Sequence, residues 1–584
     1  MAEERELSYY INKASELVGK NFEKKIRIGI ISSFTINGLE ESIRVKLAEK
    51  NIDCITYVGG YNQYNQEILN PESSLYKFSP DITFLIIDTR NILGELFNLP
   101  YSISALERKN FVEKKLNEIQ NLANTFTDKT KSKLIIANFD IPTYSPYGIF
   151  ETKTDYGFHK MIEDLNCGLI NDFKISDLIY IYDFNGFISR YGGDNIFDYK
   201  QFLFGDMKIS LDYIPYLAND LIGYVIGYLG LSKKCVVLDL DNTLWGGVVG
   251  EDGFNGIKLG PEPPGNAYLE FQLVLLSLYQ RGIILAINSK NNYDDALKVI
   301  EEHPYMILRK ENFASMKINW NDKVSNMKEI ANDLNIGIDS LVFFDDDPVN
   351  REFMRLNMPQ ILTVDVPQDP SQYAQTIKKM NDFSVMKITD EDTQRGKMYL
   401  EQSKRNDFEQ SAPDLESFLK NLDLKVLIKN ANEFTIPRIS QLTLKTNQFN
   451  LTTKRYQESD IKKLSEDDKY VIGCAQVKDK FGDNGITGVF IVQKENSKEW
   501  FIDTFLLSCR IMGREVEKGM LGYIMNKAKE NGVEQIKAQF IPSQKNKPIE
   551  DFLNNCGFQK DGDFWFYSLK TQFTIPEYLM VRVE

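Results

Sequence analysis

The chain has 584 residues and a formal net charge of −14 at pH 7. This length suits about three or four domains, and the acidic excess argues against nucleic acid as a partner. No long apolar run occurs and the first residues, 1–6, are charged, so we expect no secretory or membrane segment. The six scattered cysteines form no Cys-x-x-Cys pair and are typical of free thiols in a reducing cytoplasm.

Residues 1–230 are predicted to form an α/β domain. Apolar runs alternate with helical patterns, which predicts a parallel sheet with helices on both faces, as in SGNH-like or flavodoxin-like folds. The expected strands are 25–31, 53–58, 81–88, 133–138 and 178–183.

The start of this domain resembles SGNH-type hydrolases. Ser32 or Ser33 follows the first strand at the nucleophile position, and Gly60 and Asn62 could be oxyanion donors. However, the sequence has no Asp-x-x-His, and His159 lies one residue too far from an aspartate. A serine without a paired base is a poor nucleophile. We therefore expect a scaffold or docking domain, with residual acyl chemistry as the alternative.

Residues 234–245 hold the most informative motif. A β-branched run leads into Asp239 and Asp241, which as residues i and i+2 of an extended segment should point the same way. Open α/β sheets bind ligands at the carboxyl ends of their strands. Two neighbouring carboxylates repel each other unless a cation or a proton separates them, so the pair suits magnesium and a phosphoryl group.

Three later features complete a pattern. Residues 283–291 form a second apolar run ending in Asn288-Ser289, and residues 341–348 form a third run ending in three acids; Lys323 lies between them. The order Asp-x-Asp-x-Thr, Ser, Lys, Asp-Asp resembles the haloacid-dehalogenase (HAD) superfamily of aspartyl phosphotransferases.

The HAD resemblance implies roles for individual residues. Asp239 would be the nucleophile, Asp241 the general acid and base, and Lys323 the balancing cation. The carboxylates of the third run leave the ligand register open, because three acids follow one another. The expected phosphoryl- or substrate-binding residues are Thr243, Ser289, Lys290 and Asn291, and the expected Mg²⁺ ligands are Asp239, Leu240 (by its carbonyl), Asp241, Asp345 and Asp346.

The HAD-like domain is expected over 231–385, with a Rossmann-like parallel sheet and a minimal cap. Residues 248–253 follow the motif closely and are predicted to form a short flap. A site without a large cap accepts bulky substrates.

Residues 386–584 are predicted to form a mixed α+β domain. A strand, then Arg510-x-x-Gly513-x, then a helix, is similar to the pyrophosphate loop of GNAT acetyltransferases. Glu515 replaces the last small residue of that loop, and its carboxylate would repel a pyrophosphate. We expect a groove for a pantetheine arm rather than tight binding of coenzyme A.

This order of domains resembles the FkbH-like family (HAD subfamily IIIC). The resemblance lies in the segments 238–253, 445–453 and 507–514. Members act as glyceryl transferases in polyketide pathways. The resemblance implies Mg²⁺, a 1,3-bisphosphoglycerate substrate that loses both phosphates, and an acyl carrier protein whose phosphopantetheine arm receives a glyceryl thioester.

Cys509 is the predicted acyl-carrying nucleophile. It ends a strand shortly before a helix N-terminus and precedes Arg510, and both surroundings favour a thiolate. Cys509 would attack the acyl phosphate, the HAD aspartate would remove the other phosphate, and the carrier thiol would take the product. The remaining expected substrate contacts are Lys445, Asn447, Gln448, Arg510 and Arg514. A buried cysteine at the end of a core strand is the ordinary alternative.

Three other functions remain open from the sequence. The chain could be a Mg²⁺-dependent phosphatase or phosphotransferase acting on a sugar phosphate, with its C-terminal domain a binding module. It could use acetyl-CoA as an acetyltransferase, against which Glu515 argues. It could also dock a carrier protein without catalysing a reaction.

Overall fold

The computed structural model describes residues 4–396, 398–399, 401–402, 405, 408, 413–543 and 545–584. It divides into two compact units, which we call the N-terminal unit (2–225) and the C-terminal unit (226–584). The predicted boundary at 230 lies near this division. The predicted boundary at 385 falls inside the C-terminal unit, so the three-domain division stays a prediction.

The N-terminal unit contains a parallel sheet of strand order β2-β1-β3-β4-β5. This is the flavodoxin-like order, in which the chain switches direction between β1 and β3. Each strand is a short apolar run, as the sequence predicted. Its strands are β1 (Lys24–Ser32), β2 (Ile52–Val58), β3 (Ile82–Ile86), β4 (Lys133–Ala137) and β5 (Ile179–Tyr182).

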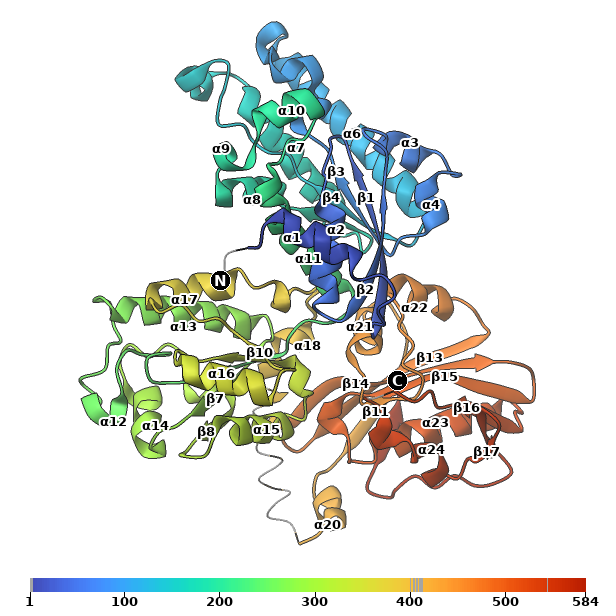
Figure 1. The fold of residues 1–584 in the computed structure, drawn as a ribbon. Helices are drawn as coiled ribbons and strands as arrows, with labels where there is room; N and C mark the ends of the chain where they lie inside the picture. The colour runs from blue at the N-terminus through green and yellow to red at the C-terminus, as the bar shows by residue number, and fades with distance from the viewer. Residues whose placement is uncertain are drawn as a thin grey trace. The chain divides into compact units, whose positions relative to one another are not determined.

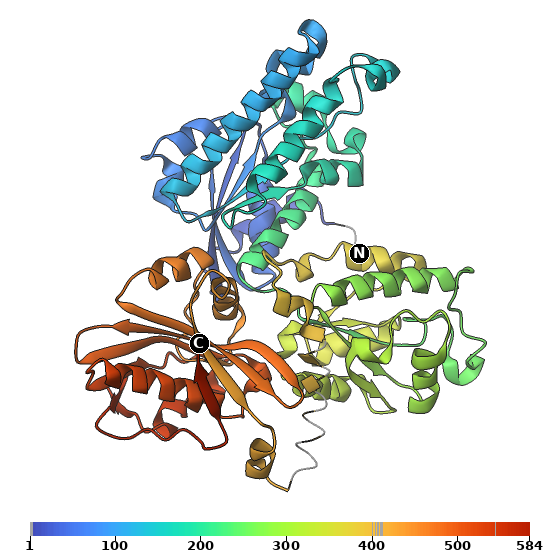
Figure 2. The ribbon, with the colours of Figure 1, turned by 180° about the vertical axis from the view of Figure 1, so that it is seen from behind.

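Helices cover both faces of this sheet. One face carries α1, α2 and α11 (Figure 1), and the opposite face carries α6 and α7 (Figure 2). A capping box at Ser104 and Glu107 fixes the start of the 25-residue helix α6. The helices are α1 (Leu7–Ser15), α2 (Leu39–Ala48), α3 (Tyr64–Leu69), α4 (Ser74–Phe78), α5 (Thr89–Leu93), α6 (Ala105–Lys129), α7 (Phe158–Phe173), α8 (Phe184–Tyr191), α9 (Gly193–Ile196), α10 (Tyr199–Gly205) and α11 (Ile214–Tyr228).

The second sheet begins the C-terminal unit and is also parallel, in the order β10-β9-β6-β7-β8. Alternate residues of its central strand enter different cores. Val236 and Leu238 pack with α13, α14 and α17, whereas Cys235 and Val237 pack with α15 and α16. The elements are β6 (Cys235–Leu238), α12 (Val249–Asp252), α13 (Gly265–Gln280), β7 (Ile284–Ser289), α14 (Tyr293–Glu302), β8 (Phe313–Ile318), α15 (Lys323–Asp333), β9 (Leu341–Phe344), α16 (Pro348–Asn357), β10 (Leu362–Thr363), α17 (Tyr373–Lys378) and α18 (Asp390–Thr393).

The third sheet is mixed, in the order β17-β18-β16-β15-β14-β13-β11-β19, with β12 paired to β15. Strand β15, helix α23 and parallel strand β16 form its βαβ unit. The predicted α/β class with parallel sheets and a mixed sheet is therefore confirmed. The elements are α20 (Leu415–Lys420), β11 (Lys425–Asn430), α21 (Ile436–Lys445), β12 (Phe449–Asn450), α22 (Glu458–Ser465), β13 (Tyr470–Asp479), β14 (Gly482–Lys494), β15 (Glu499–Leu507), α23 (Val516–Glu530), β16 (Gln535–Gln539), α24 (Phe552–Asn555), β17 (Gln559–Asp561), β18 (Phe564–Ser568) and β19 (Met580–Val583).

Among the residues that the structure describes, no helix combines the length and the apolar character needed to cross a bilayer.

Candidate functional site

The central strand of the second sheet ends at Asp239. β6 is buried on both faces, and the Asp239 N–H donates to the Phe344 carbonyl of β9 at 3.1 Å, which keeps the residue in register with the neighbouring strand. Its side chain then emerges at the carboxyl edge of the sheet. Asp239 is only 8% exposed, so its charge depends on the groups around it.

Lys323 supplies the first of these groups. Asp322 caps α15 by accepting the Ser325 N–H at 2.8 Å, so that the helix begins at Lys323. The Lys323 Nζ lies 2.9 Å from Asp239 Oδ2 and 2.5 Å from Asp345 Oδ2. Burial opposes its charge, but attraction to both carboxylates outweighs burial and raises the pKa of Lys323. The side chain therefore stays cationic.

Asp239, Asp345 and Asp346 form a carboxylate cluster in which one oxygen of each lies within 4.8 Å of the others. Burial and the charge of Asp239 raise the pKa of Asp345 and of Asp346 to about 6. Asp239 Oδ1 is buried and has no hydrogen-bond partner among the residues that the structure describes. One ammonium does not balance this many carboxylates, and hard oxygen ligands suit a divalent cation.

Asp241 lies beside the cluster but is held differently. Its Oδ1 accepts Trp245 Nε1–H at 2.9 Å and the Val249 N–H at 3.1 Å, and its Oδ2 accepts from Asn291 Nδ2 at 2.8 Å. Burial nevertheless raises the pKa of Asp241, despite these donors. A carboxyl oriented in this way can exchange a proton without joining the cation ligands.

The flap expected at 248–253 contains α12 and is bonded to the site. The Val248 N–H donates to Asp252 Oδ2 at 2.8 Å, while the next N–H, that of Val249, holds Asp241. Gly247 has a φ of +92° and donates its N–H to Asn242 Oδ1 at 2.8 Å. The flap thus supplies one of the donors that orient the Asp241 carboxyl, together with Trp245 and Asn291.

The other predicted residues of this edge are distributed as follows. Thr243 Oγ1 donates to Asp346 Oδ1 at 3.2 Å, and Ser289 is buried at the end of β7. Asn291 reaches Asp241, as described, whereas the neighbouring Lys290 is exposed. The Leu240 carbonyl accepts the N–H groups of Thr243 and Leu244, at 3.1 and 2.8 Å, so its predicted role as a metal ligand has no support in this geometry.

The structure gives the three acids of the run different partners. Asp345 accepts from Lys323, Asp346 meets Thr243, and Asp347 accepts the Val349 N–H at 2.8 Å as the cap of α16. Asp347 is therefore a structural cap, and Pro348 takes the first helical position that prolines favour.

Sequence reasoning missed three supporting residues. The buried Gln272 side chain donates to Leu244 O and accepts two backbone N–H groups, and Arg351 donates to the carbonyls of Asp345 and Asp346. These contacts leave no local pattern. Trp320 is 71% exposed, and it lines a cavity of about 420 Å³ together with Asn291 and Tyr293. An exposed tryptophan in the polar loop just before Lys323 was a usable signal.

The Cys509 region lies at the end of β15. The segment 445–453 reaches it, because β12 pairs with β15 through Phe449 and Leu507. Two of the segments with family resemblance therefore meet in space. Among the predicted contacts, Asn447 accepts from Arg455, Gln448 is half-buried, and Arg514 forms an ion pair with Asp479 at 3.3 Å.

Buried and half-buried cations gather near Cys509. Burial lowers the pKa of Lys234 and Lys445, and burial with repulsion from other guanidinium groups lowers the pKa of Arg395 and Arg438 to about 10. Asp392 pairs with Arg395 and lies 3.9 Å from Lys445, so one carboxylate serves two of these cations. We call this set the cation cluster: Lys234, Arg395, Arg438, Lys445 and Arg510.

Cys509 and Asp239 lie at opposite edges of the second sheet. Cys509 packs on the core that contains Cys235, and its carbonyl accepts from Asn335 just beyond α15. From Lys234 to Asp239 the strand rises about 16 Å, and from Lys323 to Asn335 the helix rises about 18 Å. The structure therefore does not bring the two predicted reaction centres together.

In the N-terminal unit, the two candidate serines accept hydrogen bonds from backbone N–H groups. Ser33 Oγ accepts the Asp88 N–H at 2.8 Å, and Ser32 Oγ accepts the Phe34 N–H at 3.2 Å. Within the described residues, no hydrogen bond joins either serine to a histidine. Gly60 and Asn62 follow β2, where the predicted oxyanion role stays a prediction.

The comparisons with known proteins agree with this architecture. Residues 27–226 match a family model described as the FkbH N-terminal domain. The chain is similar to the crystal structure of the N-terminal part of BF1531 from Bacteroides fragilis, which contains a phosphatase domain in complex with Mg. The two are 28% identical, with a TM-score of 0.60 over 66% of this chain and 100% of that one.

Weaker similarity extends to the ribosomal-protein-S18-alanine N-acetyltransferase from Escherichia coli, at 10% identity and a TM-score of 0.21 over 26% of this chain and 97% of that one. No curated protein matches the chain. Together these findings support a relationship to FkbH proteins over residues 27–226 and similarity over 66% of the chain to a structure that contains a phosphatase domain.

Proposed function

We propose that this chain is a Mg²⁺-dependent HAD-type phosphatase coupled to glyceryl transfer. The carboxylate cluster bridged by Lys323, with Asp239 Oδ1 buried and unpartnered, carries the phosphatase part of the proposal. Asp239, Asp345 and Asp346 would hold Mg²⁺, which supplies positive charge to the phosphoryl oxygens. Similarity to the Mg-bound Bacteroides fragilis phosphatase domain supports this choice of metal.

The residues then divide the chemistry between them. Asp239 attacks phosphorus and forms an aspartyl phosphate, while Asp241 gives its proton to the leaving oxygen, which departs as an alcohol. Asp241 then takes a proton from water as the water attacks phosphorus, which releases inorganic phosphate and restores Asp239. The raised pKa of Asp241 suits the first step, and Lys323 with Thr243 balances and orients the oxygens.

Phosphate release tests this half of the proposal. With Mg²⁺ and 3-phosphoglycerate or a general aryl phosphate, Asp239→Asn should reduce turnover about a thousandfold or more, because no nucleophile remains. Asp365→Asn is the matched control, since this exposed acid pairs with Arg355 at the surface. Turnover retained by Asp239→Asn would contradict the proposal.

The transfer half rests on the cation cluster. A thiol close to buried and half-buried cations is suited to an anionic acyl donor such as the acyl phosphate of 1,3-bisphosphoglycerate. The Cys509 thiolate would attack the acyl carbon and expel inorganic phosphate, leaving a thioester. A carrier thiol would then attack this thioester, and Cys509 would leave and recover its proton.

Intact-mass spectrometry tests the transfer. Incubation with 1,3-bisphosphoglycerate should give an acyl adduct that Cys509→Ala abolishes. Cys167→Ala is the control because Cys167 is an exposed free thiol in the N-terminal unit. Adduct formation that survives Cys509→Ala, or that depends on Cys167, would leave the sugar-phosphate phosphatase as the better function.

A further inference from the structure

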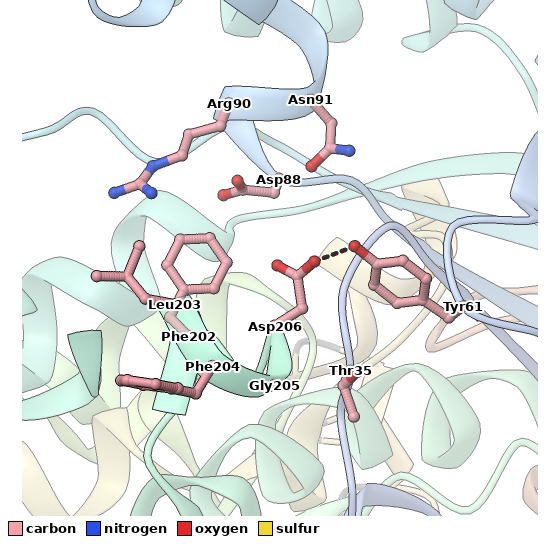
Figure 3. A pocket seen from close by; sticks show the side chains of 10 residues that line it. All are labelled: Thr35, Tyr61, Asp88, Arg90, Asn91, Phe202, Leu203, Phe204, Gly205 and Asp206. Carbon is pink, nitrogen blue, oxygen red and sulfur yellow. Dashed lines mark hydrogen bonds between the residues drawn. The ribbon is translucent and has the colours of Figure 1, made fainter. Parts of the chain in front are cut away.

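The N-terminal unit contains a cavity of about 640 Å³ at the carboxyl edge of its sheet. The cavity lies where the strand order reverses between β1 and β3, which is where open α/β sheets bind ligands. Its volume is within the range of small-molecule sites. Figure 3 shows its lining residues, which are Thr35, Tyr61, Asp88, Arg90, Asn91, Phe202, Leu203, Phe204, Gly205 and Asp206.

The floor of the cavity holds a buried carboxylate with an unused oxygen. Asp88 is 1% exposed, and its Oδ1 pairs with Lys208 Nζ, while its Oδ2 has no hydrogen-bond partner in the described part of the chain. Lys208 also pairs with Asp140 Oδ1 at 2.7 Å, which in turn accepts from Thr89 Oγ1 at 2.6 Å. One ammonium thus serves two carboxylates, and Asp88 Oδ2 remains to accept a hydrogen bond from a ligand.

The rim offers both hydrogen-bond donors and acceptors. Arg90 lies over the Phe202 ring at 4.6 Å, with Asn91 next to it in the chain, while Asp206 accepts from the Tyr61 hydroxyl (Figure 3). Arg90 and Lys208 would repel an ammonium ligand, whereas Asp88 and Asp206 would repel a phosphate or a carboxylate. Hydroxyl groups suit this mixture, because each can both donate and accept.

The remaining wall is apolar and unusually exposed. Phe204 is 88% exposed, Leu203 75% and Tyr61 54%, all beside the same cavity. Such surfaces cover the C–H faces of a sugar ring while its hydroxyls reach the polar groups.

We propose that this cavity binds a neutral, polyhydroxylated ligand of the sugar class. Asp88 and Asp206 would accept from its hydroxyls, Arg90 and Asn91 would donate to them, and Phe204 would cover the ring. The proposal is for binding rather than hydrolysis, because within the described residues no hydrogen bond joins Ser32 or Ser33 to a histidine that could act as a base. The proposal is independent of the phosphatase and transferase reactions.

Saturation-transfer NMR on the full chain tests the proposal. Glucose, N-acetylglucosamine, ribose and myo-inositol serve as probes, and spermidine serves as the amine probe. At least one polyhydroxylated probe should receive saturation and give a dissociation constant by titration, and spermidine should not. Absence of binding by all four, or binding of spermidine alone, would overturn the proposal.

Three variants locate the binding. Phe204→Ala removes an exposed ring without disturbing a core, and Asp206→Asn retains a residue type that tolerates the φ of +54° found there. Phe204→Ala and Asp206→Asn should each weaken binding about tenfold. Phe434→Ala is the control, because Phe434 is 85% exposed in the C-terminal unit. Equal binding by all three variants would place the ligand elsewhere and refute the assigned site.

Discussion

At the scale of single residues, the acidic run after β9 gives three neighbouring aspartates three different tasks. Asp346→Asn should remove one carboxylate of the cluster, whereas Asp347→Asn should keep the cap of α16, because asparagine is an equally good cap. We expect Asp346→Asn to require at least about tenfold more Mg²⁺ for half-maximal phosphate release. Equal Mg²⁺ titrations for the two variants would contradict the register.

The same residues show which features of the site could be predicted from the sequence and which could not. The order of the motifs predicted Asp239, Lys323 and an acidic pair, because strand ends and helix starts follow from apolar periodicity. It could not separate Asp345 from Asp346 and Asp347, since that distinction depends on where a helix begins and which side chains reach it. The positions of Gln272 and Arg351 depend on contacts between remote segments, and no local pattern predicts them.

Glu517 gives a pH-dependent prediction. Its Oε2 is buried in the first turn of α23 and has no hydrogen-bond partner within the described ranges, and burial raises the pKa of Glu517 from 4.5 to about 7. A raised carboxyl pKa costs no stability below pH 4.5, where the group is protonated in both states, and the cost grows as the pH rises to about 7.

Glu517→Gln should therefore stabilise the protein above pH 7 by up to about 3 kcal/mol, and have little effect near pH 4. Chemical denaturation at both pH values measures the difference. Glu530→Gln, at the far end of the same helix, is the control. An equal effect of Glu517→Gln at both pH values would argue against this titration.

At the scale of elements, the flap after β6 links backbone conformation to catalysis. A Cβ at Gly247 would lie 2.5 Å from Asp252 Oδ2, the group that holds the Val248 N–H, whereas a Cβ at Gly253 would meet open space. Both glycines have positive φ, so both alanine variants carry backbone strain, and the ψ of 173° at Gly253 lies in a region that essentially only glycine adopts.

Only Gly247→Ala should then displace the flap and with it the Val249 N–H that orients Asp241. We expect kcat for phosphate release to fall about tenfold or more in Gly247→Ala, while Gly253→Ala stays within about twofold. Equal losses in both variants would mean that strain alone, rather than the flap position, controls the rate.

Elements were predicted most securely where the signal is local. The apolar runs that became β1, β3, β4, β6, β7 and β9 are continuous, and parallel strands buried on both faces have that composition. The two-residue strand β12 pairs with β15 across more than fifty residues of chain. A pairing of this kind depends on tertiary structure, so the meeting of the 445–453 and 507–514 segments was predicted only by resemblance.

At the scale of the whole molecule, the two units should respond separately to ligands. A ligand that binds only the folded form stabilises it by about 2.7 kcal/mol at a hundred times its dissociation constant. We expect two calorimetric transitions, with Mg²⁺ raising only the one that belongs to residues 226–584 by a few degrees. Asp346→Asn should abolish this shift and Asp347→Asn should keep it; a shift of both transitions would contradict two separate units.

The distance between Asp239 and Cys509 constrains the order of steps in the proposed reaction. A phosphorylated three-carbon acid reaches about 7 Å when extended, less than half the length of strand and helix between the two groups. A glyceryl phosphate tethered to the cysteine is therefore too short to present its ester to the aspartate. The phosphate ester must therefore be hydrolysed while the acid is free, or after the acid has been transferred to the longer arm of a carrier protein. In the second case the carrier would have to reach both the Cys509 site and the Asp239 site in turn.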